Sequence, residues 1–278
     1  MNRNELNIMI IAAHPDDAEA RAGGFAALCR RHGHRVGMVS ATNGCTGHYA
    51  MGGGELARRR QQEARASAQL IGAESLVLDV QSNELDGNLY LRKRLTEIIR
   101  AFRADLVLTH RPNDYHPDHR YTAILVQDTS ATLCNPNVCP LTPPLKQAPS
   151  FLYMADNFTK PWPFTADLVF DIDSVLDMKI AMQAEHASQM FEWLPWESGT
   201  LAEVPTEPSA RRTWLKAERS RRDKQAAISF REKLIAKYGP AAGAQIQYAE
   251  GFEFCEYGGG SLRKARDAQT GKTPWFNF

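Results

Sequence analysis

Two short stretches contain the residue types that bind metal ions and transfer protons. Residues 14–17 read His-Pro-Asp-Asp, and residues 116–119 read His-Pro-Asp-His. Imidazoles and carboxylates are common zinc ligands, and a catalytic zinc site uses three protein ligands with one open position. His14, one of the two adjacent aspartates and one of His116 and His119 would supply that set. The two stretches together therefore predict a divalent metal site.

The aspartate and the histidine of these stretches that do not bind the metal could transfer protons. Neighbouring side chains of an extended backbone point in opposite directions, so Asp16 and Asp17 cannot both face one ion. The free carboxylate is a candidate general base toward a metal-activated water. The free histidine is a candidate general acid or oxyanion partner. Asp118, which stands beside it, is expected to orient its imidazole and raise its pKa.

Both stretches directly follow apolar runs, at residues 7–12 and 106–109, which predict buried strands. Pro15 disfavours a helical conformation at the residue before it, so the first strand should end there. Ligands of open α/β sheets bind at the carboxyl ends of the strands. The predicted metal site is therefore expected at this edge of a sheet.

The first two thirds of the chain alternate predicted strands with predicted helices. The strands are expected at residues 7–12, 35–42, 75–80, 105–109, 151–155 and 167–172. The helices are expected at residues 19–32, 55–71, 89–102, 118–133, 175–190 and 211–238, with a loop at 192–208. This order predicts an α/β fold with a mostly parallel sheet flanked by helices. No Gly-x-Gly-x-x-Gly follows the first strand, which argues against a nicotinamide cofactor.

The composition limits the classes of partner and compartment. The chain has 278 residues, 43% of them hydrophobic, which is enough for one large domain with a full core. Its net charge of +1 gives no indication of a nucleic acid partner. Its five cysteines are scattered, as is typical of a reducing compartment. With no recognisable leader peptide or membrane span, we expect a cytoplasmic protein.

The predicted site lies in the first part of the chain. Residues 1–190 are expected to form the core that carries it, and residues 191–278 a C-terminal helical and loop extension that completes the pocket. The tail after Gly258 has little to bury except Trp275, Phe276 and Phe278. Aromatic side chains at a chain end commonly dock on a surface, so a homo-oligomer interface is expected there.

The two paired stretches resemble the motifs of the PIG-L/LmbE-like zinc-dependent N-acetylglucosamine deacetylases. The resemblance covers most of residues 7–130 and continues weakly at Lys179, at 186–189 and at 248–252. It implies a Rossmann-like α/β sheet, a Zn²⁺ cofactor and a small N-acylated amino sugar as substrate. Two positions differ from the family pattern: Cys45 stands where relatives tend to have an acidic residue, and Gly251 stands where alanine is usual.

The resemblance also implies a role for each site residue. The implied zinc ligands are His14, Asp17 and His119. Asp16 would be the general base. His116 would protonate the leaving amine or stabilise the tetrahedral intermediate, and Asp118 would hold His116. Arg60 matches an Arg-x-x-Glu helix motif whose arginine is near the family's active site.

Two other classes of protein remain compatible with these residues. Two histidines and one carboxylate also form the facial triad of non-haem iron oxygenases. A metal-bearing sugar-binding protein without catalysis is the third alternative. For the deacetylase, the mouth of the pocket is expected at residues 43–54, 113–115 and 193–196. The side chains expected to stack on a sugar ring are Tyr49, Trp162, Trp193 and Trp196.

Overall fold

The computed structural model of the chain describes residues 5–276 and 278. In this part of the chain the strands form one seven-stranded sheet in the order β3-β2-β1-β4-β5-β7-β6. The strands are β1 (Asn7–Ala12), β2 (Arg35–Ser40), β3 (Glu74–Val77), β4 (Leu106–Thr109), β5 (Ser150–Met154), β6 (Leu168–Asp171) and β7 (Ala249–Gly258). The first five are parallel, and β7 runs antiparallel to both β5 and β6. The predicted α/β fold with a mostly parallel sheet is therefore confirmed.

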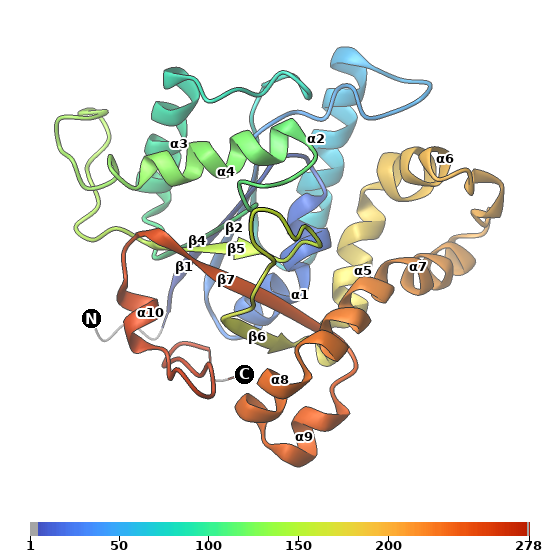
Figure 1. The fold of residues 1–278 in the computed structure, drawn as a ribbon. Coiled ribbons are helices and arrows are strands. Elements are labelled where there is room, and N and C mark those ends of the chain that lie inside the picture. The colour runs from blue at the N-terminus through green and yellow to red at the C-terminus, as the bar shows by residue number, and fades with distance from the viewer. Residues whose placement is uncertain (1–4, 277) are drawn as a thin grey trace.

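Helices cover both faces of the sheet (Figure 1). They are α1 (Asp17–Arg31), α2 (Gly53–Leu70), α3 (Leu89–Phe102), α4 (Pro117–Thr129), α5 (Leu176–Glu185), α6 (Leu194–Glu197), α7 (Pro208–Ser229), α8 (Arg231–Tyr238), α9 (Pro240–Gln245) and α10 (Ser261–Ala265). Short helical turns are η1 (Asp173–Val175), η2 (Ser188–Trp193) and η3 (Leu201–Glu203). One core packs α1 and α5 against the sheet, and a second packs α3 and α4 against its other face. Alternate residues of the central strands, such as Ile8 and Met9 of β1, supply the two cores.

The local sequence explains how the chain turns from strand to helix beside the predicted site. After β1, Pro15 ends the extended segment and α1 begins at Asp17. After β4, the ring of His116 caps α4 by accepting a hydrogen bond from the Asp118 backbone N–H, and Pro117 occupies the first helical position. Both motifs therefore lie at the carboxyl ends of adjacent parallel strands, as predicted.

The last third of the chain differs most from expectation. The predicted helix at 211–238 is two helices, because α7 ends at Ser229 and α8 begins at Arg231. The predicted loop at 192–208 contains α6 and η3. Strand β7 was not predicted as a strand, yet it lies between β5 and β6 and completes the sheet.

The aromatic tail packs on the core of its own chain. Phe276 is 1% exposed, and its ring lies 5.3 Å from that of Phe25 in α1. Phe278 stacks on His32 at 4.4 Å. These intramolecular contacts account for the aromatic residues that suggested an interface, and the homo-oligomer stays a prediction.

Candidate metal centre and active site

Three side-chain atoms converge where β1 and β4 end. His14 Nδ1 lies 3.2 Å from Asp17 Oδ2, His119 Nε2 lies 3.4 Å from the same oxygen, and the two nitrogens are 3.3 Å apart. Two ligands that each lie about 2.0–2.1 Å from a tetrahedral zinc ion are roughly 3.3–3.4 Å from each other. His14, Asp17 and His119 therefore have the spacing of one face of a tetrahedral metal site, and they could hold a metal ion.

Two further carboxylates orient the histidine pair. Asp118 Oδ2 lies 3.0 Å from His14 Nε2, and Asp114 Oδ2 lies 3.0 Å from His119 Nδ1. A carboxylate accepts hydrogen bonds, so each imidazole donates from that nitrogen, and the nitrogen that faces Asp17 is the one left to bind a metal. Carboxylates that hold metal-binding histidines in this way fix the tautomer and raise the basicity of the ligand.

The charges of the cluster favour a cation at its centre. Burial alone would lower the pKa of His119, but the carboxylates of Asp17 and Asp114 raise it to about 9. Burial alone would raise the pKa of Asp17, but His119, His110 and His14 hold it well below its usual range. A positive charge is therefore stabilised between the side chains that carry the predicted ligands.

His110 is a member of this cluster that sequence reasoning missed. It follows β4 directly, accepts a hydrogen bond of 3.0 Å from the Ala13 backbone N–H at Nε2, and stacks on His119 with ring centres 4.1 Å apart. Burial and the neighbouring charge of His119 lower its pKa to about 3, so its ring is neutral. A histidine directly after a predicted strand at the ligand-binding edge was the signal that could have found it.

Asp16 lies beside these candidate ligands in a strained backbone conformation. Its φ is 131°, a value that side-chain-bearing residues rarely adopt, and it precedes the first residue of α1. Its Oδ1 accepts a hydrogen bond of 3.0 Å from Arg60 Nη2. Burial raises the pKa of Asp16, which Arg60 partly offsets. The strain and the ion pair hold this carboxylate apart from that of Asp17.

Arg60 connects α2 to both loops of the site. It is 3% exposed, and it donates to the backbone oxygens of Pro15 at 2.6 Å and Gly44 at 3.4 Å. Gly44 has a φ of +72°, and a Cβ atom there would lie 2.5 Å from Arg60 Nη1. Glycine is therefore needed at position 44 for the guanidinium to reach Asp16.

His116 lies against the ligand cluster, but Asp118 does not hold it as expected. The ring centre of His116 is 4.6 Å from that of His14, and its Nδ1 accepts from the Asp118 backbone N–H. The Asp118 carboxylate bonds instead to His14 and to the Asn83 backbone N–H. The helix start at Pro117 directs this side chain toward β1. The expected rise in the pKa of His116 is also wrong, because burial and the charges of His14 and His119 lower it.

The loop at 43–54 and the segment at 193–196 form an aromatic wall. Tyr49 stacks on Trp196 with ring centres 5.3 Å apart, and Trp196 stacks on Trp193 at 5.1 Å. Tyr49 and Trp196 are 43% and 47% exposed, so part of each ring is accessible. Gln189 of η2, the turn that leads into the second segment, donates to the Gly47 carbonyl and so ties η2 to the loop.

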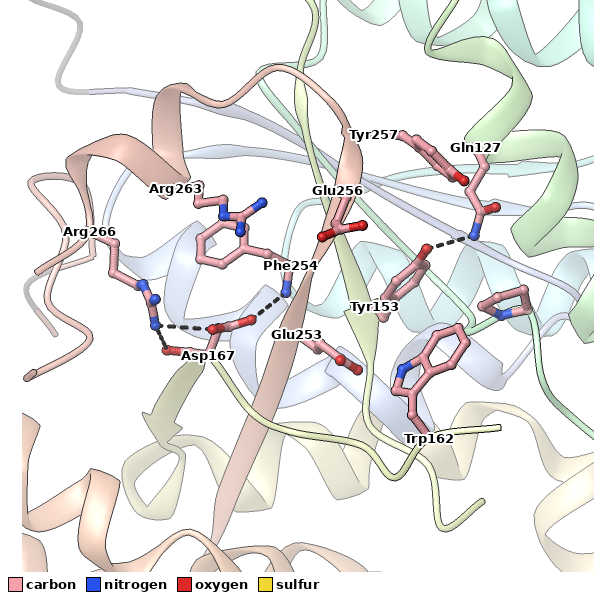
Figure 2. Close-up of a pocket in the computed structure, with 11 residues that line it drawn as sticks. Gln127, Tyr153, Trp162, Asp167, Glu253, Phe254, Glu256, Tyr257, Arg263 and Arg266 are labelled. Atoms are coloured by element: carbon pink, nitrogen blue, oxygen red, sulfur yellow. Dashed lines mark hydrogen bonds and ion pairs between the residues drawn. The ribbon is translucent and has the colours of Figure 1, made fainter. Parts of the chain in front are cut away.

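Trp162 belongs to a different cavity. Figure 2 shows this cavity of about 460 Å³, which also contains Tyr153 of β5 and Glu253 of β7. None of its 11 lining residues belongs to the metal-ligand cluster. The four aromatic residues that were expected to stack on a sugar ring therefore divide between two places.

The weaker similarities in the second half of the chain mark buried ion pairs behind the site. Lys179 Nζ lies 2.7 Å from Asp223 and 2.8 Å from Glu250, and its side chain is 1% exposed. Glu250 also accepts from the backbone N–H groups of Gly24 and Phe25. This network joins α1, α5, α7 and β7, so it positions the helix that begins with Asp17.

The comparisons with known proteins agree with this fold. An α/β sheet with a histidine and aspartate cluster at its carboxyl edge defines a class of ligand-binding and catalytic proteins. Residues 9–130 match the family model PIG-L, described as GlcNAc-PI de-N-acetylase. Over 204 residues the chain is 30% identical to the diacetylchitobiose deacetylase of Thermococcus kodakarensis, with 68% of this chain and 73% of that protein covered. The chain belongs to the PIG-L deacetylase family.

Two further relatives show the breadth of this fold. The chain is 27% identical over 136 residues to the 4-oxalmesaconate hydratase of Pseudomonas putida, which covers 46% of this chain and 53% of that protein. The structure of the N,N'-diacetylchitobiose deacetylase from Pyrococcus horikoshii, solved with an inhibitor, superposes with a TM-score of 0.68 at 24% identity. That match covers 91% of this chain and 84% of the other, and it shows the fold. No described helix is long and apolar enough to cross a membrane.

Proposed function

We propose that this protein is a zinc-dependent N-deacetylase that removes an acetyl or other acyl group from an amino sugar or sugar conjugate. The observation that carries the proposal is the triangle of His14 Nδ1, Asp17 Oδ2 and His119 Nε2, with sides of 3.2–3.4 Å. Membership of a deacetylase family supports the reaction class. When bound, a divalent metal supplies a Lewis acid that polarises an acyl carbonyl and acidifies water.

In this proposal Asp16 takes the proton of the attacking water. Its carboxylate is adjacent to the ligand cluster, and its pKa is raised by burial, which strengthens it as a base. Arg60 keeps the carboxylate in place through their hydrogen bond. Arg60 is therefore a positioning residue, and Asp16 is the group that handles the proton.

His116 has the role of hydrogen-bond donor toward the oxyanion of the tetrahedral intermediate. Its Nδ1 accepts from a backbone N–H, so the neutral ring carries its proton on Nε2. An amine leaves poorly without a proton, and Asp16 can return the proton that it has taken from the water. Asp118 acts on His14 rather than on His116, so we assign it to the orientation of a metal ligand.

Release of acetate and of free amine in equal amounts tests the proposal. The substrates are N-acetylglucosamine, its phosphates and N,N'-diacetylchitobiose, each with chelated and zinc-restored protein. We expect release that a chelator abolishes and zinc restores. Restoration by ferrous iron with consumption of oxygen would favour the oxygenase alternative, and hydration of an unsaturated acid would favour the activity named for the Pseudomonas relative. Saturable sugar binding without turnover would favour a binding protein.

A further inference from the structure

Three arginines beside the metal-ligand cluster have no ion-pair partner. Arg21 of α1 donates to the Ala155 backbone oxygen at 2.8 Å, and Arg222 of α7 donates to the same oxygen. Arg219, one turn earlier in α7, has its Nε buried without a hydrogen-bond partner. Within the described residues no carboxylate lies within 4.0 Å of any of the three.

The nearest carboxylates are already engaged by other cations. Asp156 pairs with Arg111 at 2.7 Å, and both Asp223 and Glu250 pair with Lys179. They act on Arg222 only from a greater distance, and burial together with the charge of Arg21 lowers its pKa to about 10. Asp16, whose charge acts on Arg219, pairs with Arg60. Each of these carboxylates therefore has a nearer cation, and the three guanidiniums are left without a direct ion pair.

Partly buried guanidiniums without a direct ion pair are costly unless a ligand offsets their charge. Two like charges that share one carbonyl oxygen repel each other, and partial burial removes the water that would screen them. Each guanidinium has five N–H donors, and Ala155 uses one on each of two arginines. All three residues are of intermediate exposure, so each keeps part of its surface open to solvent.

These arginines lie near the sheet edge that carries the proposed reacting groups. Ala155 directly follows β5, and β5 lies next to β4, which lies next to β1. With neighbouring strands about 4.8 Å apart, Ala155 is roughly 10 Å from the end of β1 at the same edge. The charge of Arg21 also acts on Asp114. Burial alone would raise the pKa of Asp114, but its hydrogen bond to His119 lowers that pKa to about 2. In Figure 1, α5, α6 and α7 lie together beside this side of the sheet.

We propose that Arg21, Arg219 and Arg222 form a subsite for an oxyanion carried by the substrate. Carboxylates and phosphates match the donor geometry of guanidinium groups, and paired arginines bind them strongly. This inference rests on the proposed function and narrows it, because it makes the substrate an acidic N-acylated amino sugar. One sugar ring spans much of the distance between the metal-ligand cluster and this subsite.

The test compares acidic and neutral substrates in three variants. Arg219→Gln and Arg222→Gln each remove one subsite charge. Arg221→Gln is the matched control, because Arg221 lies in the same helix, is 71% exposed and pairs with Glu218. We expect kcat/KM to be at least about tenfold higher for a phosphate or carboxylate derivative of N-acetylglucosamine than for the neutral sugar. Arg219→Gln and Arg222→Gln should each remove most of that preference, and Arg221→Gln should keep it.

Separate phosphate and carboxylate substrates show which oxyanion the subsite takes. A preference for the neutral sugar, or equal loss of the preference in all three variants, would overturn the subsite. Because Arg219 makes no hydrogen bond through Nε, its variant should fold even if Arg222→Gln does not, and thermal unfolding checks this.

A titration with inorganic phosphate separates this inference from the proposed function. Calorimetry on the zinc-loaded protein should show saturable binding that Arg219→Gln weakens at least about tenfold and Arg221→Gln preserves. If no sugar is deacetylated but this pattern holds, the deacetylase proposal fails and the subsite stands. Binding that is the same in both variants would place phosphate elsewhere and contradict the subsite.

Discussion

Asp114 controls which nitrogen of His119 carries the proton, so an Asp114→Asn variant tests how the metal centre is built. Asp114 Oδ1 accepts from the His116 backbone N–H at 2.9 Å, and Oδ2 accepts from His119 Nδ1 at 3.0 Å. Asparagine has a single side-chain oxygen, and this oxygen must face the His116 backbone N–H to accept its hydrogen bond. The amide NH2 then faces His119 Nδ1, which must accept. The imidazole proton moves to Nε2, the nitrogen that faces Asp17.

The expected magnitude follows from the contact that is lost. Removal of a partner that orients a metal-binding histidine costs about 10–100-fold in metal affinity, or about 1.4–2.7 kcal/mol. We expect Asp114→Asn near the upper end, because it reverses the tautomer. Asp118→Asn should cost closer to tenfold, since Oδ2 alone accepts from both His14 and Asn83, and one amide oxygen can keep both contacts.

Competition with a chromophoric zinc chelator measures these affinities. Asp128→Asn, on the exposed side of α4, is the control and should bind zinc as the unchanged protein does. The thermal unfolding of each metal-free variant shows whether the fold is intact. Wild-type affinity in Asp114→Asn, or a smaller loss than in Asp118→Asn, would refute the assignment of the tautomers.

Three further predictions concern strain, catalysis and pH. Asp16→Gly should be more stable than Asp16→Ala by about 1–3 kcal/mol in denaturant unfolding, because glycine adopts a φ of 131° without strain. If Asp16→Ala were the more stable variant, strain at this position would be excluded. His116→Ala should retain zinc and lower kcat more than it raises KM, as steady-state kinetics will show; normal turnover would remove His116 from the reaction. Burial lowers the pKa of Lys237 from 10.5 to about 7 in the folded protein. Between these two pH values Lys237 holds a proton in the unfolded chain but not in the folded protein, so the free energy of unfolding rises with pH. Unfolding at pH 7 and 9 should show a gain of about 2 kcal/mol that Lys237→Met abolishes, whereas an equal gain in both would contradict it.

The strand ends and the meeting of the two motifs were predictable because their signals are local. An apolar run followed by Pro15 marks the end of β1, and the same reasoning places the second motif after β4. Parallel strands bring their carboxyl ends together, so two motifs about 100 residues apart meet. This topology brings His14 near the second motif, whereas the choice of Asp17 and His119 as ligands came from the family resemblance.

The contacts that the sequence did not reveal are those that depend on tertiary packing. Asp114 and Asp118 lie on either side of the start of α4, and only the path of the backbone decides which histidine each one reaches. Lys179 and Glu250 pair across the core, 71 positions apart in the chain. Strand β7 carries Gly251 and charged residues, so its pattern did not predict a strand, and its neighbours β5 and β6 supply the pairing.

Metal content and reaction rate, measured together on two neighbouring variants, test the central claim most directly. Asp17→Asn removes a proposed ligand, and Asp16→Asn removes the proposed base but leaves the three ligand atoms in place. We predict that Asp17→Asn loses bound zinc in elemental analysis. Asp16→Asn should keep about one zinc ion per chain and lose at least about 100-fold in the rate of acetate release. Loss of zinc in Asp16→Asn with retention in Asp17→Asn, or full activity in either, would contradict the account.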